Sequence, residues 1–345
     1  MLLSFVRFDT ATEVVVAFIA VSAVILFAGV RLTAAADKIA DRTGLGEALV
    51  GSVLLGAATS LSGLTVSVTA ASAGLAELAV SNCLGGIAAQ TLFLAAADLA
   101  YRKANLEHAA ASLENMIQCT VLIFALALVG MAAAVPALSF LQIHPASYGL
   151  IAIYILGLKI TKGARDTPGW QARMTEETET DEADSTKGSQ SILRLGVTFA
   201  ALALTVAASG FVVSRAAEGA VNVFGIGESV AGAFLAAIVT SLPELVTTVA
   251  AVRRGALTLA VGGIIGGNAF DVLFIAAADT AYREGSIYAA VGERQLLLAA
   301  LATAMTAALL MGLLRRERQG PAGIGFETWL VILLYFAGSA LLIMR

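Results

Sequence analysis

The chain is dominated by long apolar stretches separated by short polar connections. A helix needs about 20 predominantly apolar residues to cross a bilayer. Ten stretches reach roughly that length, and together they predict an all-α polytopic membrane protein with ten transmembrane helices. They lie at about 12–32, 45–72, 77–101, 108–134, 145–162, 192–214, 226–252, 257–282, 290–314 and 325–344.

Composition supports a membrane protein and excludes a soluble one. Of 345 residues, 59% are hydrophobic and 13% are charged, whereas soluble domains carry roughly 25% charged residues. Cys83 and Cys119 lie in apolar stretches and indicate neither a disulfide framework nor a metal motif. The small net charge of −4 gives no reason to expect a nucleic-acid partner. We interpret the first apolar stretch as a retained transmembrane helix, because it is long for a signal peptide.

A polar segment divides the chain into two halves, 1–162 and 192–345. The intervening segment 163–191 is acidic, has no apolar periodicity and is typical of a solvated linker. Lys and Arg gather on one side of the predicted helices, 16 against 5 on the other side. The positive-inside rule then predicts a multi-pass protein of the plasma (inner) membrane, with both termini outside and the linker in the cytoplasm.

One segment occurs twice. Residues 44–102 align with 225–283 at a constant offset of 181, without gaps, and 27 of the 59 positions are identical. Five predicted helices separate equivalent positions, so the two copies should face opposite sides of the membrane. Inverted repeats of this kind are typical of secondary transporters, whose site lies near the midplane between the halves.

The second copy carries two carboxylates in the predicted membrane interior. Glu244 lies nine residues before Arg253, which places it roughly 13 Å into the membrane. An intramembrane charge is costly, so a functional role is the default interpretation. Thr240 and Ser241 share its helix face, and Pro243 should break the helix and free a carbonyl oxygen near residue 239. These are the oxygen ligands that hard cations prefer.

Asp271 is the second carboxylate, near the middle of the next predicted helix, with Asn268 on the same face. The runs Thr240-Ser241-Leu242-Pro243-Glu244-Leu245 and Gly266-Gly267-Asn268-Ala269-Phe270-Asp271 resemble the two repeat motifs of the cation/calcium exchanger superfamily, the sodium–calcium and calcium–proton antiporters. The resemblance implies that Glu244 and Asp271 are ion ligands and that Thr240, Ser241 and Asn268 line the pathway.

The first copy departs from that pattern. Thr59 and Ser60 are kept, but Ser62-Gly63 stands where the second copy has Pro-Glu, and Gln90 stands where it has Asp271. The site would therefore hold two carboxylates, both from one half. The resemblance assigns the metal-ligand positions of the first copy to Thr59, Ser60 and Gln90.

Three other acidic positions have alternative interpretations. Asp98 and Asp279 each precede an arginine by four residues, a spacing that predicts a helix-end ion pair with Arg102 and Arg283. Glu114 lies early in the fourth predicted helix, where it could replace the missing first-copy charge or lie at the interface.

The sequence thus predicts a secondary antiporter. By the resemblance the cation is Ca²⁺, exchanged for Na⁺ or H⁺ by alternating access. A monovalent exchanger of the Na⁺/H⁺ type and a transport-inactive cation-binding or sensor protein remain alternatives. Inorganic cations and the lipid bilayer are the expected partners, and no cofactor is expected. An enzyme is not indicated, because neither a nucleophile–base constellation nor a nucleotide motif is present.

Overall fold

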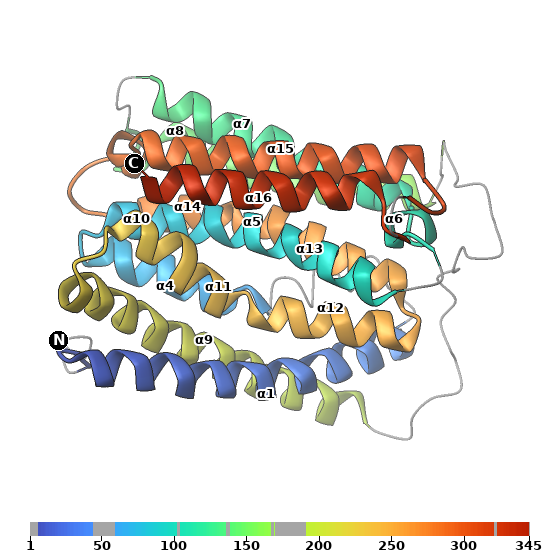
Figure 1. Cartoon of the computed structure of the whole chain (residues 1–345), viewed down its shortest axis with the longest axis horizontal. Coiled ribbons are helices and arrows are strands. Elements are labelled where there is room, and N and C mark those ends of the chain that lie inside the picture. Colours follow the sequence, from blue (N-terminus) through green and yellow to red (C-terminus); the bar gives the residue numbers. More distant parts are fainter. Residues whose placement is uncertain are drawn as a thin grey trace.

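The computed structural model describes residues 6–43, 59–101, 104–135, 139–166, 169, 191–320 and 323–344. Within these ranges the regular structure is helical, apart from an isolated bridge between Phe140 and Ile143. The long helices run side by side, and both chain ends lie at the same end of the bundle (Figure 1). In the first half these helices are α1 (Ala11–Thr43), α4 (Leu61–Ser72), α5 (Ala76–Ala100), α7 (Leu113–Ala133) and α8 (Pro145–Asp166).

The second half repeats this order. It consists of α9 (Ile192–Phe224), the series α10 (Glu228–Val230), η3 (Ala231–Ala236), α11 (Ala237–Thr240) and α12 (Leu242–Arg254), then α13 (Leu257–Asp271), α14 (Leu273–Ala281), α15 (Glu293–Arg315) and α16 (Phe326–Met344). A short helix α6 (Leu106–Ala109) precedes α7, and a 3₁₀ turn η4 (Ile287–Ala290) precedes α15.

Eight helical spans in the described part of the chain are long and apolar enough to cross a membrane. The predicted span 45–72 lies partly outside the described residues, where only α4 is seen. The predicted span 145–162 is helical as α8 but is not among the eight. The eight spans are Ala11–Ala36, Ala76–Leu99, Leu113–Ala133, Ile192–Phe224, Glu228–Arg253, Leu257–Ala281, Glu293–Arg315 and Phe326–Met344.

Several predicted boundaries were wrong. Helices α1 and α9 continue about ten residues beyond the apolar stretches that predicted them, to Thr43 and Phe224. Gly225 ends α9 in a left-handed conformation, with φ of 66°, which glycine adopts without steric cost. The predicted helix 108–134 begins only at Leu113. Ser112 caps it, because its hydroxyl accepts a hydrogen bond from the Asn115 amide at 3.1 Å.

The offset of 181 found between the repeats also relates helices outside them. Helix α1 shifted by 181 residues coincides with α9, and the first residue of α4 shifted by 181 is the first residue of α12. Helix α1 begins at the end of the bundle where both termini lie, whereas α9 begins at the opposite end (Figure 1). The two equivalent helices therefore run in opposite directions.

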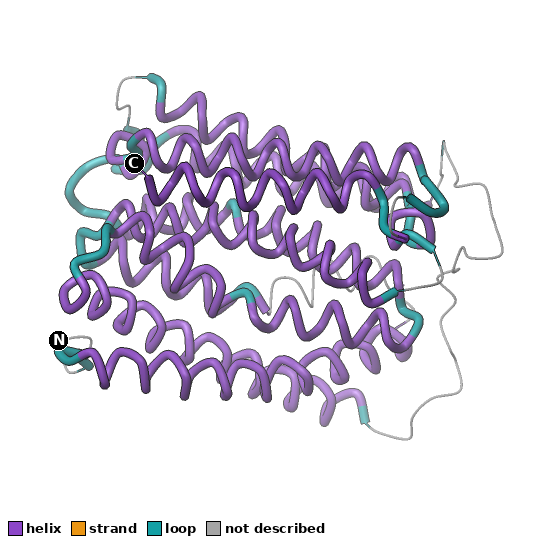
Figure 2. Tube along the Cα trace, viewed as in Figure 1, coloured by secondary structure: helices purple, strands orange, loops and turns teal. Residues whose placement is uncertain are grey.

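The helix that carries Glu244 is interrupted about midway along the bundle, as Figure 2 shows in the loop colour. The interruption is at Ser241, between α11 and α12, and Pro243 lies in the first turn of α12. Proline suits the first turn of a helix because its missing N–H has no intrahelical partner there. The break is therefore encoded locally, by the residues that precede Glu244.

Two glycines let the long outer helices approach these breaks. On α9, a Cβ added to Gly210 would overlap the backbone of Ser62, including its carbonyl oxygen. At the equivalent position on α1, a Cβ on Gly29 would lie 3.2 Å from Cα of Pro243. Each outer helix thus packs closely against the break in the opposite half.

Candidate cation site

The two helix breaks meet inside the bundle and enclose a small polar cavity. Helix α4 begins just after Ser60, and α12 begins just after Ser241. The cavity has a volume of about 10 Å³, room for roughly one water-sized particle. Its lining comprises Ser60, Gly63, Asn82, Gly86, Gln90, Thr240, Ser241, Glu244, Asp271 and Phe274.

Glu244 enters the cavity from the first turn of α12 and is 2% exposed. The Ser60 hydroxyl donates to its Oε1 at 3.4 Å, and the Thr59 hydroxyl also donates to this carboxylate. The other oxygen, Oε2, has no hydrogen-bond partner. A buried carboxylate oxygen without a donor is costly, so this atom is available to a ligand.

Asp271 lies opposite, at the end of α13, and is 1% exposed. The Gln90 side chain donates from Nε2 to Asp271 Oδ2 at 2.6 Å, and the same nitrogen lies 3.3 Å from the Ser241 hydroxyl. The second oxygen, Asp271 Oδ1, has no partner. The first-copy residue therefore fixes the second-copy carboxylate without neutralising it.

Among the described lining residues, three side-chain oxygen atoms have no hydrogen-bond partner, namely Glu244 Oε2, Asp271 Oδ1 and Gln90 Oε1. The two carboxylates repel each other, and none of the described residues that line the cavity is basic. Carboxylate and amide oxygens are suitable ligands for hard cations. Within the described residues, no three His, Cys, Asp or Glu side chains are grouped so as to hold a metal. A cation here would rely on two carboxylates and neutral oxygens.

Six of the eight predicted site residues line the cavity, and two lie beside it. The six are Ser60, Gln90, Thr240, Ser241, Glu244 and Asp271. Thr59 contacts Glu244 from outside the lining. Asn268 turns away from the cavity toward α5, where its Nδ2 donates to the Thr91 hydroxyl at 3.0 Å. Asn268 Oδ1 has no partner.

The sequence analysis missed two polar residues of the first half. Asn82 on α5 donates from Nδ2 to the Gly63 carbonyl and to the Ser67 hydroxyl, each at 3.0 Å. Its Oδ1 lies 3.5 Å from the Thr240 hydroxyl. The Ser62 hydroxyl donates to the Thr240 carbonyl at 3.0 Å. The carbonyl group at the break is thus that of Thr240, and it already accepts a hydrogen bond from the Ser62 hydroxyl. The sequence signal for Asn82 was an amide side chain within a predicted membrane span.

Phe274 occupies the space beside Gly63. A Cβ added to Gly63 would lie 2.7 Å from Cε2 of the Phe274 ring. Gly63 is the position equivalent to Glu244, so an aromatic ring stands where a first-copy carboxylate would project. Phe274 packs edge-on against Phe270, with ring centroids 6.0 Å apart. The lost charge is therefore accompanied by apolar packing, not by an empty space.

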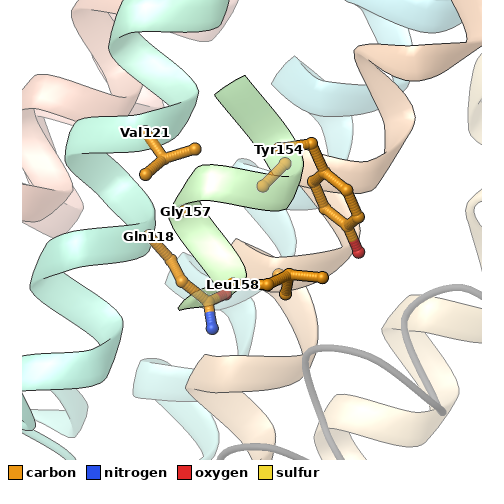
Figure 3. A pocket seen from close by; sticks show the side chains of 7 residues that line it. Gln118, Val121, Tyr154, Gly157 and Leu158 are labelled. Carbon is orange, nitrogen blue, oxygen red and sulfur yellow. The ribbon is translucent and has the colours of Figure 1, made fainter. Parts of the chain in front are cut away.

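A second cavity of about 10 Å³ lies between α7, α8 and α13 (Figure 3). Its lining includes Gln118 and Tyr154, and Tyr154 packs edge-on against Phe270 at 5.9 Å. The row formed by Tyr154, Phe270 and Phe274 runs from this cavity to the polar one. Aromatic side chains thus lie between the two cavities.

The predicted ion pair between Asp279 and Arg283 was wrong. Asp279 instead accepts hydrogen bonds from the His144 amide at 2.7 Å and the Ser147 hydroxyl at 2.9 Å. It also accepts from the Ile287 amide at 3.1 Å. The pair of Asp98 with Arg102 lies outside the described residues. Glu114 lies in the first turn of α7 and does not line the cavity.

Comparison with known proteins identifies the family. A family model described as "Sodium/calcium exchanger protein" matches residues 13–161 and 194–344, most of the chain. The protein belongs to the sodium/calcium exchanger family. It is therefore an integral, multi-pass membrane protein of a transporter family and not an enzyme.

Curated relatives match only part of the chain. The chain is 34% identical over 122 residues to "Inner membrane protein YrbG" of Escherichia coli K12, covering 37% of that protein. It is 36% identical over 120 residues to "Putative antiporter CaxA" of Alkalimonas amylolytica, covering 36%. In each case the match spans about a third of the relative's length.

Solved structures of exchangers share the fold over nearly the whole chain. A structure of the sodium–calcium exchanger NCX_Mj aligns over 95% of this chain and 97% of its own, with a TM-score of 0.63 and 17% identity. A crystal structure of an H⁺/Ca²⁺ exchanger, CAX, aligns over 96% of this chain and 86% of its own, with a TM-score of 0.65 and 16% identity. At this identity the likeness shows the fold alone.

Proposed function

We propose that the protein is a secondary active antiporter that exchanges Ca²⁺ for Na⁺ or H⁺ by alternating access. The observation that carries this proposal is the cavity between the helix breaks, where Glu244 Oε2 and Asp271 Oδ1 are buried without partners. Two negative charges, with no basic side chain among the described lining residues, match the charge of one divalent cation. The same groups can bind protons or monovalent cations in exchange.

The architecture supports this mechanism. We infer ten transmembrane helices in two inverted five-helix repeats, because helices related by the offset of 181 begin at opposite ends of the bundle. Alternating access in such folds is a rocking of one repeat against the other around a central site. The cavity is bounded by both halves, so relative motion of the halves can expose it to either side.

A monovalent exchanger is the second candidate, favoured by the packing of Phe274 against Gly63. Ca²⁺ takes six to eight oxygen ligands, and its affinity rises with the number of charged ligands. The ring excludes a third carboxylate, so the site has fewer charges than the inverted repeat could supply. Two carboxylates with few neutral oxygens suit the alternate binding of Na⁺ and H⁺.

A flux experiment tests these alternatives. The full chain is reconstituted in liposomes, and uptake of ⁴⁵Ca²⁺ and ²²Na⁺ is measured under imposed Na⁺ and pH gradients. Ca²⁺ uptake driven by an outward Na⁺ or H⁺ gradient supports the proposal. Na⁺ flux driven by pH alone, without Ca²⁺ flux, supports the monovalent exchanger. Absence of flux for every cation would reject transport and favour a sensor.

The orientation is a separate proposal, which rests on the 16-to-5 distribution of Lys and Arg. We infer an inner-membrane protein with both termini outside and the linker 163–191 in the cytoplasm. A cysteine at Ser185, in a variant without Cys83 and Cys119, should resist a membrane-impermeant thiol reagent in intact cells. Rapid labelling from outside would reverse the orientation.

A further inference from the structure

Helix α5 ends, α6 lies and α16 begins at the same end of the bundle (Figure 1). Each of these three helices carries one buried carboxyl group there. The three residues are Asp98 on α5, Glu107 on α6 and Glu327 on α16, and none is more than 2% exposed. Asp98 lies eight residues beyond Gln90 on the same helix, about 12 Å along its axis. This acidic group is therefore separate from the cation cavity, although α5 connects the two.

Asp98 has a structural role that explains its burial. Its Oδ1 accepts a hydrogen bond from the Leu106 amide at 2.7 Å, and its Oδ2 accepts one from the Thr328 hydroxyl at 2.8 Å. These bonds join α5 to the start of α6 and to the first turn of α16. Both oxygens are used, so hydrogen bonds from two other segments hold the Asp98 side chain in place.

Glu107 and Glu327 are placed differently. The two side chains lie within hydrogen-bonding reach of each other, and the Oε2 atom of each is buried without a hydrogen-bond partner. Glycines make the room for Glu327. A Cβ on Gly312 would lie 2.5 Å from Cγ of Glu327, and one on Gly325 would overlap its carboxyl group. The chain thus provides a fitted space for a second acid beside Glu107.

Basic side chains near this group have other partners. Arg316, after α15, donates to the His108 carbonyl at 3.3 Å, and the His108 ring Nδ1 lies 2.8 Å from the Arg316 carbonyl. Arg315 pairs with Glu317 at 3.2 Å. Arg318 lies in the same connection after α15, and the titratable residue just after α5 is Tyr101. The part of α13 that packs beside α6 carries no charged residue. Among the described residues, no basic side chain forms an ion pair with Glu107 or Glu327.

Buried acids that lack a counter-charge cannot all be ionised. Burial, and then the charges of Asp98 and Glu327, raise the pKa of Glu107 well above its ordinary value. Two carboxyl groups in contact share a proton, because one ionised partner stabilises the protonated form of the other. The described residues hold no cluster of acids, His or Cys arranged for a metal, so a proton is the ligand that fits.

The equivalent end of the other half lacks this pair. There Asp279 repeats the bonds of Asp98, with the Ile287 amide and the Ser147 hydroxyl at the positions of the Leu106 amide and the Thr328 hydroxyl. At the offset of 181, however, Glu107 becomes Tyr288 and Glu327 becomes Ala146. The scaffold around the aspartate is thus common to both halves, and the acid pair is an addition to one of them.

We propose that Glu107 and Glu327 form a proton-binding site that holds one shared proton at neutral pH. The proton joins the two carboxyl groups as a carboxyl–carboxylate pair. The site binds a proton whatever ion the central cavity carries, so it does not rest on the proposed antiport. It links the pH at this end of the protein to α5, which also lines the cation cavity.

Infrared spectroscopy of the purified full chain in nanodiscs tests the site. The signal of protonated carboxyl groups is titrated from acid to neutral pH in the wild type and in the double variant Glu107→Gln plus Glu327→Gln. We expect the double variant to lose one protonated carboxyl group per protein at neutral pH. Glu114→Gln, at the same end of the bundle, is the matched control and should lose none.

A second variant controls for misfolding. Glu107→Tyr with Glu327→Ala installs the residues that pack around Asp279 in the other half, and it should elute as one species and lose the same single signal. A folded double variant that loses no protonated carboxyl group, or that loses two, would overturn the shared proton. The measurement needs no transport, so failure of antiport would leave it unaffected.

Discussion

The two copies of the repeat form the same helix break and supply different chemistry. In the second copy the break carries Glu244 and the next helix carries Asp271. In the first copy the equivalent positions are Gly63 and Gln90, and both still reach the same cavity. The backbone architecture of a repeat can thus persist after its charges are lost.

The first copy, which lacks the two carboxylates, positions the carboxylates of the second copy. Gln90 fixes Asp271 with a 2.6 Å hydrogen bond, Ser60 donates to Glu244, and Ser62 binds the Thr240 carbonyl. These contacts orient both carboxylates and leave one oxygen of each free. One half of the protein thus supplies the charged ligands, and the other half holds them in position by hydrogen bonds.

Removing charge from the second copy should have the largest effect on transport. Glu244→Gln keeps the shape of the side chain and removes half of the cavity's charge, so flux in proteoliposomes should fall to background. Loss of a charged hydrogen-bonding interaction worth about 3 kcal/mol corresponds to a decrease of at least about 100-fold. Glu114→Gln is a matched control that should retain wild-type flux. Wild-type flux in a folded Glu244→Gln protein would contradict the assignment of the site.

Gly210→Ala and Gly29→Ala compare how tightly the two breaks are packed. The added Cβ at 210 overlaps the Ser62 backbone, whereas the one at 29 lies 3.2 Å from Pro243. Overpacking of a tight contact costs typically about 1–3 kcal/mol. We therefore expect Gly210→Ala to lower the thermal stability in detergent clearly more than Gly29→Ala. Equal losses would show that the helices adjust equally on both sides.

Much of the fold could be predicted from the sequence, because apolar length alone determines whether a helix can span a membrane. The all-helical membrane class was therefore predicted correctly, while helix ends such as Thr43 and Phe224 were not, since polar residues continue both helices beyond the apolar stretch. Pro243 indicated the break because proline removes a specific hydrogen bond.

The site was only partly predictable. Glu244 and Asp271 were recognisable because charge is rare inside a membrane, and their role in ion binding stays a prediction. Asn82 and Phe274 could not be assigned, because their contacts with Gly63 depend on the register between helices of different segments. Glu107 was likewise missed, since its partner Glu327 lies 220 residues away in the chain.

Restoring a charge to the first copy would test whether Phe274 limits the ion that binds. Gly63→Glu with Ser62→Pro should place the new side chain against the Phe274 ring, so this variant should be less stable than the wild type. Adding Phe274→Ala removes the clash, and the triple variant should bind Ca²⁺ more tightly, because affinity rises with ligand charge count. Calorimetry measures the affinity, and Phe274→Ala alone is the control.

A result in either direction is informative for this variant set. If a folded triple variant binds Ca²⁺ no better than Phe274→Ala, the charge at position 63 does not determine the ion. A new buried Glu can also take up a proton, because the described lining of the cavity offers it no basic partner. The titration is therefore repeated at a higher pH, where that proton is released.

The smallest effect should be a change in how stability depends on pH, and it compares the acidic end of the bundle with its equivalent in the other half. The pKa of Glu107 is raised in the folded protein from its ordinary 4.5, so the folded state holds its proton to higher pH than the unfolded state. The contribution of this group to stability is then fully present below about pH 4.5 and is lost as pH rises through the raised pKa. In Glu107→Gln nothing titrates at this position. The apparent melting temperature should therefore fall less between pH 5 and pH 8 than in the wild type, when both are measured at one scan rate in detergent. A change of 1 kcal/mol corresponds to roughly 2–4 °C for a domain of about 150–250 residues. Tyr288→Phe, at the equivalent position, should leave the wild-type pH dependence in place, and an equally steep decline in Glu107→Gln would show that other groups cause it.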